Sequence, residues 1–399
     1  MKKLCWNPIL LLLSLSLLAS VSVQAQVQIQ EKQALTLPIS RPDAPPLALR
    51  GEFKVGVKTL KLTDSTRKRD FTLEVWYPAK LTAGQLEATV YSARAGALDI
   101  KLTGQALRNA APSSGKYPLI IVSHGQPGSR YALTYLTEAL AARGFVVAAI
   151  DHTGSTYGDL KQESFVSSIV DRPLDVLYTL EALPKLIPGA DGQNVGLLGY
   201  SYGGYTSLNA AGVALSKADL ETYCKATGNE GPCFVLPFFD PLEAARGAKI
   251  KPDPRIKAVM VMAPYGAPWF SKKALGSMKV PLFVGGGSAD DVATYARDAK
   301  TIFERSSSKA KFLLTLEGAL HNPWVNPAPV ETYGNFKEYE RWSEPVWDKQ
   351  RTGDIVKHFA SAFFSSYLKA DKKAGEFLSS GLPGFLPRTT EGIKLELRK

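Results

Sequence analysis

Long apolar stretches, metal-binding patterns and nucleotide-binding patterns are all scarce in this 399-residue sequence. Beyond residue 25, no apolar run approaches the roughly 20 residues that a transmembrane helix needs. There is also no H-E-x-x-H pattern, no P-loop, no nucleic-acid-binding motif and no internal repeat. We therefore expect no metal, no cofactor, no nucleic-acid partner and no stable membrane insertion, and the chemistry has to come from ordinary side chains.

The first 25 residues have the features of a secretory signal peptide. Lys2 and Lys3 form a positively charged start, residues 9–18 are apolar apart from two serines, and small residues at positions −3 and −1 offer a cleavage site after Ala25. The apolar stretch is short for a membrane span, so an uncleaved anchor is the weaker interpretation. We expect an exported protein, periplasmic or extracellular, whose formal net charge falls from +11 to +9 when the two lysines are removed.

Cysteine is nearly absent: there are three, and Cys5 lies in the predicted signal peptide. Cys224 and Cys233 remain, nine positions apart in a polar stretch that contains glycine. An even pair in an exported protein predicts a local disulfide. Metal binding is the weaker interpretation, because two thiols alone do not complete a zinc site.

The apolar patterns predict an α/β protein. Residues 26–50, rich in glutamine and proline, are expected to be extended, and residues 51–399 to form one domain that opens with two antiparallel strands, at 53–62 and 71–77. From residue 117 onward, continuous apolar runs alternate with helical patterns, which predicts a mostly parallel sheet with helices on both faces. The expected strands are 119–122, 145–150, 195–198, 256–262, 281–284 and 312–316, and the expected helices are 131–143, 171–186, 202–213, 292–304 and 355–368.

Two stretches break this alternation. Residues 214–254 carry Cys224 and Cys233 without a clear period, and they are too long for a plain connection, so they are predicted to form an insertion or lid over the sheet edge. Residues 322–350 form a second such stretch. The helix at 171–186 contains Pro173, which a first turn tolerates.

The strongest chemical signal is the run from Gly199 to Gly204, which contains a G-x-S-x-G pattern between a short apolar strand and a helix. In that context the pattern predicts a nucleophile elbow, in which the glycines permit a very tight turn and Ser201 is held out at the carboxyl edge of the sheet. The adjoining helix N-terminus favours developing negative charge. Ser201 is therefore the predicted nucleophile.

A serine nucleophile needs a base, and only four histidines are available. In this kind of site the order along the chain is serine, acid, histidine, and His321 alone lies downstream of Ser201 in a loop after a strand. The acid should follow the strand at 281–284, where Asp290 and Asp291 are adjacent. Asp290 is favoured, because Asp291 has the position of a helix N-cap before Val292, but the choice stays open.

The oxyanion of such a reaction needs two backbone N–H groups. Tyr202, directly after the nucleophile, is predicted to supply one, and Gln126, in the glycine-rich loop after the strand at 119–122, the other. Pro127 cannot donate. The large aromatic residues Tyr265, Trp269 and Trp324 are predicted to form an apolar substrate pocket near the mouth of the site. The upstream His124 and His152 are expected to have a structural, hydrogen-bonded role.

These motifs resemble the branch of the α/β-hydrolases that contains dienelactone-hydrolase-like proteins and platelet-activating-factor acetylhydrolases. The resemblance spans about residues 51–370. Besides the elbow it is carried by four segments, 75–78 (VWYP), 123–125 (SHG), 151–155 (DHTGS) and 172–175 (RPLD). It implies an α/β-hydrolase fold and hydrolysis of a small ester or lipid through an acyl-enzyme, as in lipid degradation. The sequence departs from true dienelactone hydrolases in having serine rather than cysteine at the elbow and in the insertion at 214–254.

Other functions remain open. A peptidase or amidase would use the same triad on amides, and an acyltransferase would prefer an acceptor alcohol to water. A protein on this fold that binds but does not catalyse is the third alternative, against which an intact triad argues.

Overall fold

The computed structural model describes residues 40–228, 231–247 and 249–398. The predicted signal peptide and residues 26–39 of the predicted extended segment lie outside these described residues. Residues Arg41–Lys399 form one compact unit.

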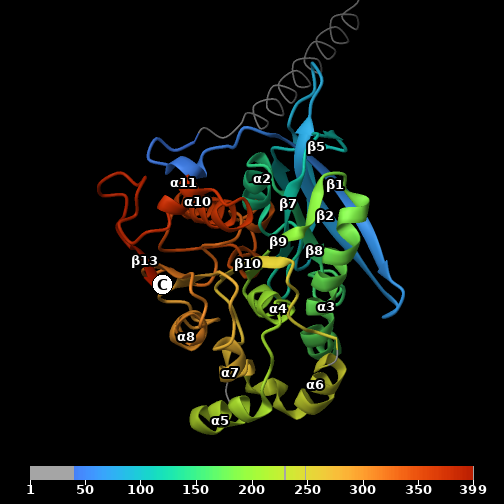
Figure 1. Cartoon of the computed structure of the whole chain (residues 1–399), viewed down its shortest axis with the longest axis vertical. Coiled ribbons are helices and arrows are strands. Elements are labelled where there is room, and N and C mark those ends of the chain that lie inside the picture. The colour runs from blue at the N-terminus through green and yellow to red at the C-terminus, as the bar shows by residue number, and fades with distance from the viewer. Residues whose placement is uncertain (1–39, 229–230, 248, 399) are drawn as a thin grey trace, which may run out of the picture. The chain divides into compact units, whose positions relative to one another are not determined.

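The apolar runs of the sequence assemble into one large mixed sheet (Figure 1). In the described part of the chain its strand order is β13-β12-β11-β10-β9-β7-β8-β2-β1-β5, and β6 pairs with β2. The strands from β8 to β12 run parallel, and β1, β2 and β13 add antiparallel edges. The strands of this sheet are β1 (Lys54–Asp64), β2 (Arg69–Lys80), β5 (Leu107–Arg108), β6 (Ala111–Pro112), β7 (Tyr117–Ser123), β8 (Val146–Asp151), β9 (Ala190–Tyr200), β10 (Ile256–Met262), β11 (Leu282–Gly287), β12 (Lys311–Leu316) and β13 (Ile393–Arg398).

Helices cover both faces of this sheet, as the sequence predicts (Figure 1). The α-helices are α2 (Thr134–Ala142), α3 (Gln162–Leu186), α4 (Tyr202–Ala210), α5 (Lys217–Thr227), α6 (Phe239–Gly247), α7 (Lys272–Leu275), α8 (Thr301–Arg305), α9 (Phe336–Tyr339), α10 (Lys349–Leu368) and α11 (Lys372–Glu376). Short 3-10 or π segments are η1 (Pro46–Ala48), η2 (Gly231–Phe238), η3 (Ala267–Trp269), η4 (Ala296–Lys300) and η5 (Val330–Thr332). No helix among the described residues has the length and apolarity needed to cross a bilayer.

The alternation of side chains along the strands divides the interior into two cores. In β7, Leu119 and Ile121 belong to the core beneath α3 and α4, whereas Ile120 and Val122 belong to the core beneath α2 and α10. Successive side chains of a strand point to opposite faces, so a strand buried on both sides must be apolar throughout. This explains why the parallel strands read as continuous apolar runs.

Helix α3 begins nine residues earlier than predicted, so Pro173 lies inside the helix and not in its first turn. A proline there leaves the carbonyl four residues earlier without its helical donor. That carbonyl belongs to Ile169, and it accepts a hydrogen bond from the Tyr205 hydroxyl on α4 at 2.9 Å. The neighbouring helix therefore satisfies the group that proline would leave unpaired.

Other boundaries also differ from the prediction. The helix expected at 292–304 is a turn followed by η4 and α8. Strand β2 continues past Pro78, which pairs with Val55 of β1. A separate two-stranded sheet, β3 (Thr89–Ala95) with β4 (Leu98–Gly104), and the edge strand β13 were not predicted.

The stretch at 214–254 contains α5, η2 and α6, at the bottom of Figure 1, and the predicted disulfide between Cys224 and Cys233 is present in it. Both cysteines are buried. This segment packs against α3 and η3.

Candidate active site

Ser201 lies in the turn between β9 and α4, with φ 54° and ψ −121°. Such a positive φ is costly for a residue with a side chain, so the surroundings must impose it. A Cβ on Gly199 would lie 2.1 Å from the Gly203 carbonyl oxygen, and one on Gly203 would lie 2.0 Å from the Ser123 carbonyl oxygen. The backbone N–H of Ser201 donates to the Met262 carbonyl at 2.9 Å. Glycine on each side therefore permits the turn that holds the hydroxyl at the carboxyl end of the sheet.

His321 comes from the loop after β12 and meets this serine. Its Nε2 lies 2.9 Å from Ser201 Oγ, and its Nδ1 lies 2.8 Å from Asp290 Oδ2. With the carboxylate accepting the Nδ1 proton, Nε2 is left as the acceptor for the serine hydroxyl. Ser201, Asp290 and His321 are 8%, 5% and 8% exposed, so the row is shielded but open at its serine end. This arrangement can deprotonate the serine as the hydroxyl attacks.

Asp290 and Asp291 have different surroundings. Asp290 Oδ1 accepts the backbone N–H groups of Val292 and Ala293, each at 2.9 Å, while its Oδ2 faces His321. Asp291 is exposed and lines the cavity in front of the serine. The N-cap role expected for Asp291 is therefore wrong: Asp290 itself accepts these N–H groups, and they fix the orientation of its carboxylate.

The two predicted oxyanion donors come from different segments: Gln126 lies in the loop after β7, and Tyr202 is the residue directly after the serine. Gly125, directly before Gln126, passes so close that a Cβ on it would lie 3.3 Å from Ser201 Cβ. Among the described residues, no hydrogen bond occupies the backbone N–H of Gln126 or of Tyr202. Two free N–H groups beside a serine hydroxyl can stabilise negative charge on a substrate oxygen.

A cavity of about 600 Å³ opens in front of Ser201 and His321. Its lining includes the loop 125–128, Tyr157 and residues of the segment 336–345 from the second irregular stretch. Phe336, at its rim, is 76% exposed, and Trp342 is buried in its wall. No residue of the insertion at 214–254 that the structure describes lines this cavity. The described part of that insertion packs against α3 and η3 instead.

The three predicted pocket aromatics lie elsewhere. Trp269 is 1% exposed and donates from its indole to the Pro232 carbonyl at 2.7 Å. Trp324 is fully buried against Gly285 of β11. Tyr265 is partly buried beneath the Arg297 guanidinium. None of the three lines the cavity, because their apolar side chains pack in the core. The aromatic residues that do line the cavity are Tyr157, Tyr200, Phe336, Tyr339 and Trp342.

The other histidines are buried away from the cavity. Burial lowers the pKa of His124 and of His152 well below the usual value, and the pKa of His358 to about 3. His358 Nδ1 accepts the backbone N–H of Leu47 at 3.2 Å. All three are neutral at physiological pH and take part in internal hydrogen bonds.

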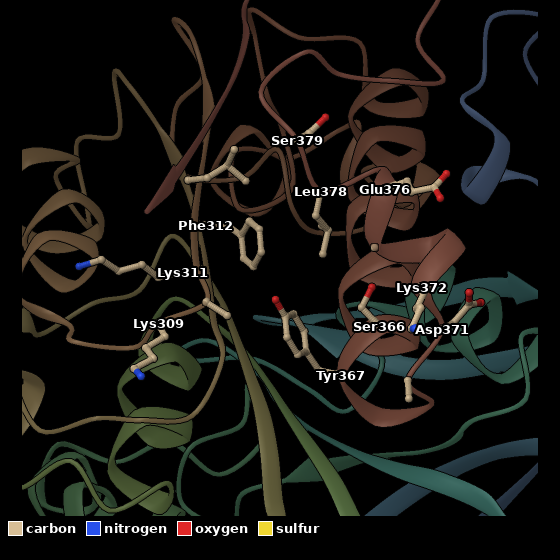
Figure 2. A pocket seen from close by; sticks show the side chains of 14 residues that line it. Lys309, Lys311, Phe312, Ser366, Tyr367, Asp371, Lys372, Glu376, Leu378 and Ser379 are labelled. Atoms are coloured by element: carbon tan, nitrogen blue, oxygen red, sulfur yellow. The ribbon is translucent and has the colours of Figure 1, made fainter. Parts of the chain in front are cut away.

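A second cavity, of about 620 Å³, lies between β12, β13, α10 and α11 (Figure 2). Phe312, Tyr367 and Leu378 point into it, and the charged side chains of Lys309 and Glu376 stand at its edges. It contains none of the residues that surround Ser201. Among the described residues, no group of three or more His, Cys, Asp or Glu side chains has the arrangement of a metal site.

The sequence from residue 119 to 360 matches the model of the alpha/beta hydrolase family. A solved structure of a ferulic acid esterase from Streptomyces cinnamoneus is similar, with a TM-score of 0.60 and 18% identity, over 92% of this chain and 99% of that one. At this identity the likeness establishes the fold alone. No curated protein matches the sequence.

Proposed function

The chain belongs to the alpha/beta hydrolase family, and from this premise we propose that it hydrolyses carboxylic esters through an acyl-enzyme on Ser201. The observation that carries the proposal is a row of two hydrogen bonds beside a cavity that Ser201 and His321 line. Ser201 Oγ lies 2.9 Å from His321 Nε2, and His321 Nδ1 lies 2.8 Å from Asp290 Oδ2. Serine is a weak nucleophile at neutral pH, and an adjacent base with an oriented tautomer is what activates it.

In the proposed reaction, His321 Nε2 takes the hydroxyl proton as Ser201 Oγ bonds to the ester carbonyl carbon. The carbonyl oxygen becomes an oxyanion, held by the N–H groups of Gln126 and Tyr202. The carbon–alkoxy bond then breaks, and the imidazolium gives its proton to the departing alcohol. Water attacks the acyl-enzyme with His321 again as base, which releases the acid and restores the serine.

The shape of the cavity bears on the substrate class. Its aromatic wall at 336–345 and its apolar rim offer contact area to an acyl or alcohol group larger than acetyl. We propose a small ester or lipid as substrate, and a place for this chain in the dienelactone-hydrolase-like and platelet-activating-factor-acetylhydrolase-like branch on the motifs named above. An ester of ferulic acid belongs in the panel of test substrates, because the similar solved structure is a ferulic acid esterase.

The deciding experiment treats the purified protein with a fluorophosphonate probe and measures hydrolysis of p-nitrophenyl acetate and of a long-chain p-nitrophenyl ester. We expect labelling and hydrolysis in the parent and the loss of both in Ser201→Ala. Ser167→Ala, which removes an exposed hydroxyl on α3, is the matched control and should behave as the parent. A folded parent that neither labels nor hydrolyses any ester would contradict the proposal.

The same assay separates the alternatives. Faster turnover of p-nitroanilides than of esters would indicate an amidase or peptidase. An ester product formed on addition of an acceptor alcohol would indicate an acyltransferase. Either outcome keeps Ser201 as nucleophile and changes the proposed substrate.

We also propose that the protein is exported. The disulfide between Cys224 and Cys233 is compatible with an oxidising compartment, where such bonds persist.

A further inference from the structure

A buried guanidinium lies beneath the loop that carries Gln126. Arg172, on α3, has no exposed surface. Burial lowers its pKa to about 10, so it stays charged at neutral pH. An isolated buried charge is costly, and here polar groups of the surrounding backbone and side chains compensate it. The reaction proposed above gives this charge no role.

The contacts of Arg172 converge on one loop. Its Nη2 donates to the His124 carbonyl and, at 3.0 Å, to Ser123 Oγ. Its Nη1 donates to the Gly125 carbonyl at 3.3 Å and to Gln126 Oε1 at 3.1 Å. The planar fork of a guanidinium can serve several acceptors at once, which an ammonium cannot do with the same geometry.

The bond to the Gly125 carbonyl has a consequence for the oxyanion donor. The Gly125 carbonyl and the Gln126 N–H belong to the same peptide unit, which is trans, so the two groups point in opposite directions. Arg172 contacts this carbonyl oxygen from the interior, and so does His124, whose Nδ1 lies 2.6 Å from it. The Gln126 N–H is therefore directed away from the interior, toward the cavity that Gln126 and Ser201 line. A hydrogen bond donated to the carbonyl also polarises the peptide unit and makes its N–H a stronger hydrogen-bond donor.

The same guanidinium touches the other half of the oxyanion hole. Its carbon Cζ lies 4.7 Å from the centre of the Tyr202 ring, a cation–π distance. Tyr202 supplies the second N–H. Arg172 therefore contacts both residues whose backbones face the substrate oxygen.

A chain of buried hydrogen bonds anchors Arg172 in turn. Ser123 Oγ, which accepts from Arg172, lies 2.9 Å from His152 Nε2, and His152 Nδ1 lies 3.0 Å from Asp175 Oδ2. Arg69 donates to the same carboxylate at 2.8 and 2.9 Å. Ser123, His152 and Asp175 are linked by hydrogen bonds in the same way as Ser201, His321 and Asp290, although their order along the chain differs; none of them has exposed surface, so no substrate reaches Ser123.

We propose that Arg172 is a positioning residue for the oxyanion hole: it orients and polarises the Gly125–Gln126 peptide and packs on Tyr202, and the Ser123–His152–Asp175 chain holds it in place. This inference rests on the proposed function. Removal of one oxyanion donor typically costs about 100- to 1000-fold in kcat. Misdirecting a donor costs less, and we expect kcat of Arg172→Lys to fall about 10- to 100-fold while KM changes less than about threefold.

The test combines kinetics with a spectroscopic readout that a merely structural role would not move. An ester labelled with ¹³C at its carbonyl carbon and deacylating slowly is trapped as the acyl-enzyme at low pH, and the infrared band of its carbonyl is recorded. Hydrogen bonds from the oxyanion hole lower that frequency. We expect Arg172→Lys to shift the band upward relative to the parent. The control is Arg297→Lys, another largely buried arginine over a tyrosine ring, which should leave the band unchanged.

Ser123→Ala removes one acceptor of Arg172 with the loss of a single oxygen, and it provides a second route if Arg172→Lys does not fold. It should shift the band in the same direction by a smaller amount. An unchanged band and unchanged kcat in the folded variants would overturn the assignment while the proposed function stands. A parent that forms no acyl-enzyme at all would overturn both.

Discussion

At the scale of single residues, the two adjacent carboxylates differ in what they can do. Asp290 Oδ1 already accepts two backbone N–H groups, so an asparagine at this position must place its oxygen there and turn its NH2 toward His321 Nδ1. The imidazole would then carry its proton on Nε2 and could not accept one from Ser201. The orientation that makes Asp290 useful is thus set by the backbone of the following turn.

We therefore predict that Asp290→Asn lowers kcat by about 10⁴-fold with little change in stability, whereas Asp291→Asn stays within about threefold of the parent. Steady-state hydrolysis of p-nitrophenyl acetate by both variants checks this. Equal losses in the two variants, or a loss confined to Asp291→Asn, would mean that the acid has been wrongly assigned.

At the scale of elements, the two irregular stretches divide their roles. The insertion at 214–254 packs on α3 and η3 and carries a disulfide, whereas the segment at 336–345 lines the cavity. The disulfide between Cys224 and Cys233 closes a short loop, and such a crosslink mainly limits the freedom of the unfolded chain. Its effect should therefore appear in stability and not in turnover.

We predict that the double variant Cys224→Ser, Cys233→Ser loses about 2 kcal/mol of unfolding free energy in urea, with kcat/KM for a long-chain ester within about threefold of the parent. A disulfide variant that folds normally yet loses turnover would place the insertion in the site after all.

Phe336→Ala is the converse case: it removes an exposed ring at the cavity rim, so we expect unchanged stability and a higher KM for the long-chain ester.

At the scale of the whole molecule, a buried histidine joins distant parts of the chain. His358 of α10 accepts the backbone N–H of Leu47 and packs among the rings of Phe359, Phe377 and Phe385. Its folded pKa of about 3 is below the ordinary 6.5, chiefly because burial opposes the charged form. The stabilisation is therefore complete above pH 6.5, and it is lost as the pH falls from there toward 3.

Acidification from pH 7 to 5 should accordingly cost about 2 kcal/mol through this residue, at 1.36 kcal/mol per pKa unit. His358→Asn retains an acceptor for the Leu47 N–H and does not titrate, so urea unfolding at the two pH values should show a smaller acid loss in the variant. If the unfolding free energies of parent and variant differ by the same amount at both pH values, His358 does not cause the acid loss and the prediction is contradicted.

The features that depend on local sequence were predictable. Continuous apolar runs determined the parallel strands, and β10 begins and ends where predicted, because a strand buried on both faces admits few polar residues. The glycines around Ser201, the downstream position of His321 and the adjacent pair at 290–291 were recognisable from spacing. The structure brings Ser201, His321 and Asp290 together because the carboxyl ends of parallel strands meet at one edge of the sheet.

What the sequence could not determine depends on contacts between distant elements. Helix α3 continues through Pro173 because Tyr205, on another helix, satisfies a carbonyl. Trp269 and Trp324 are buried in the core instead of lining a pocket. The sequence pattern around an aromatic residue does not distinguish these two positions. The interior contacts of Arg172 likewise join α3 to the end of β7 and to the loop that follows it. Periodicity records which residues are buried, but only tertiary packing decides which groups they meet.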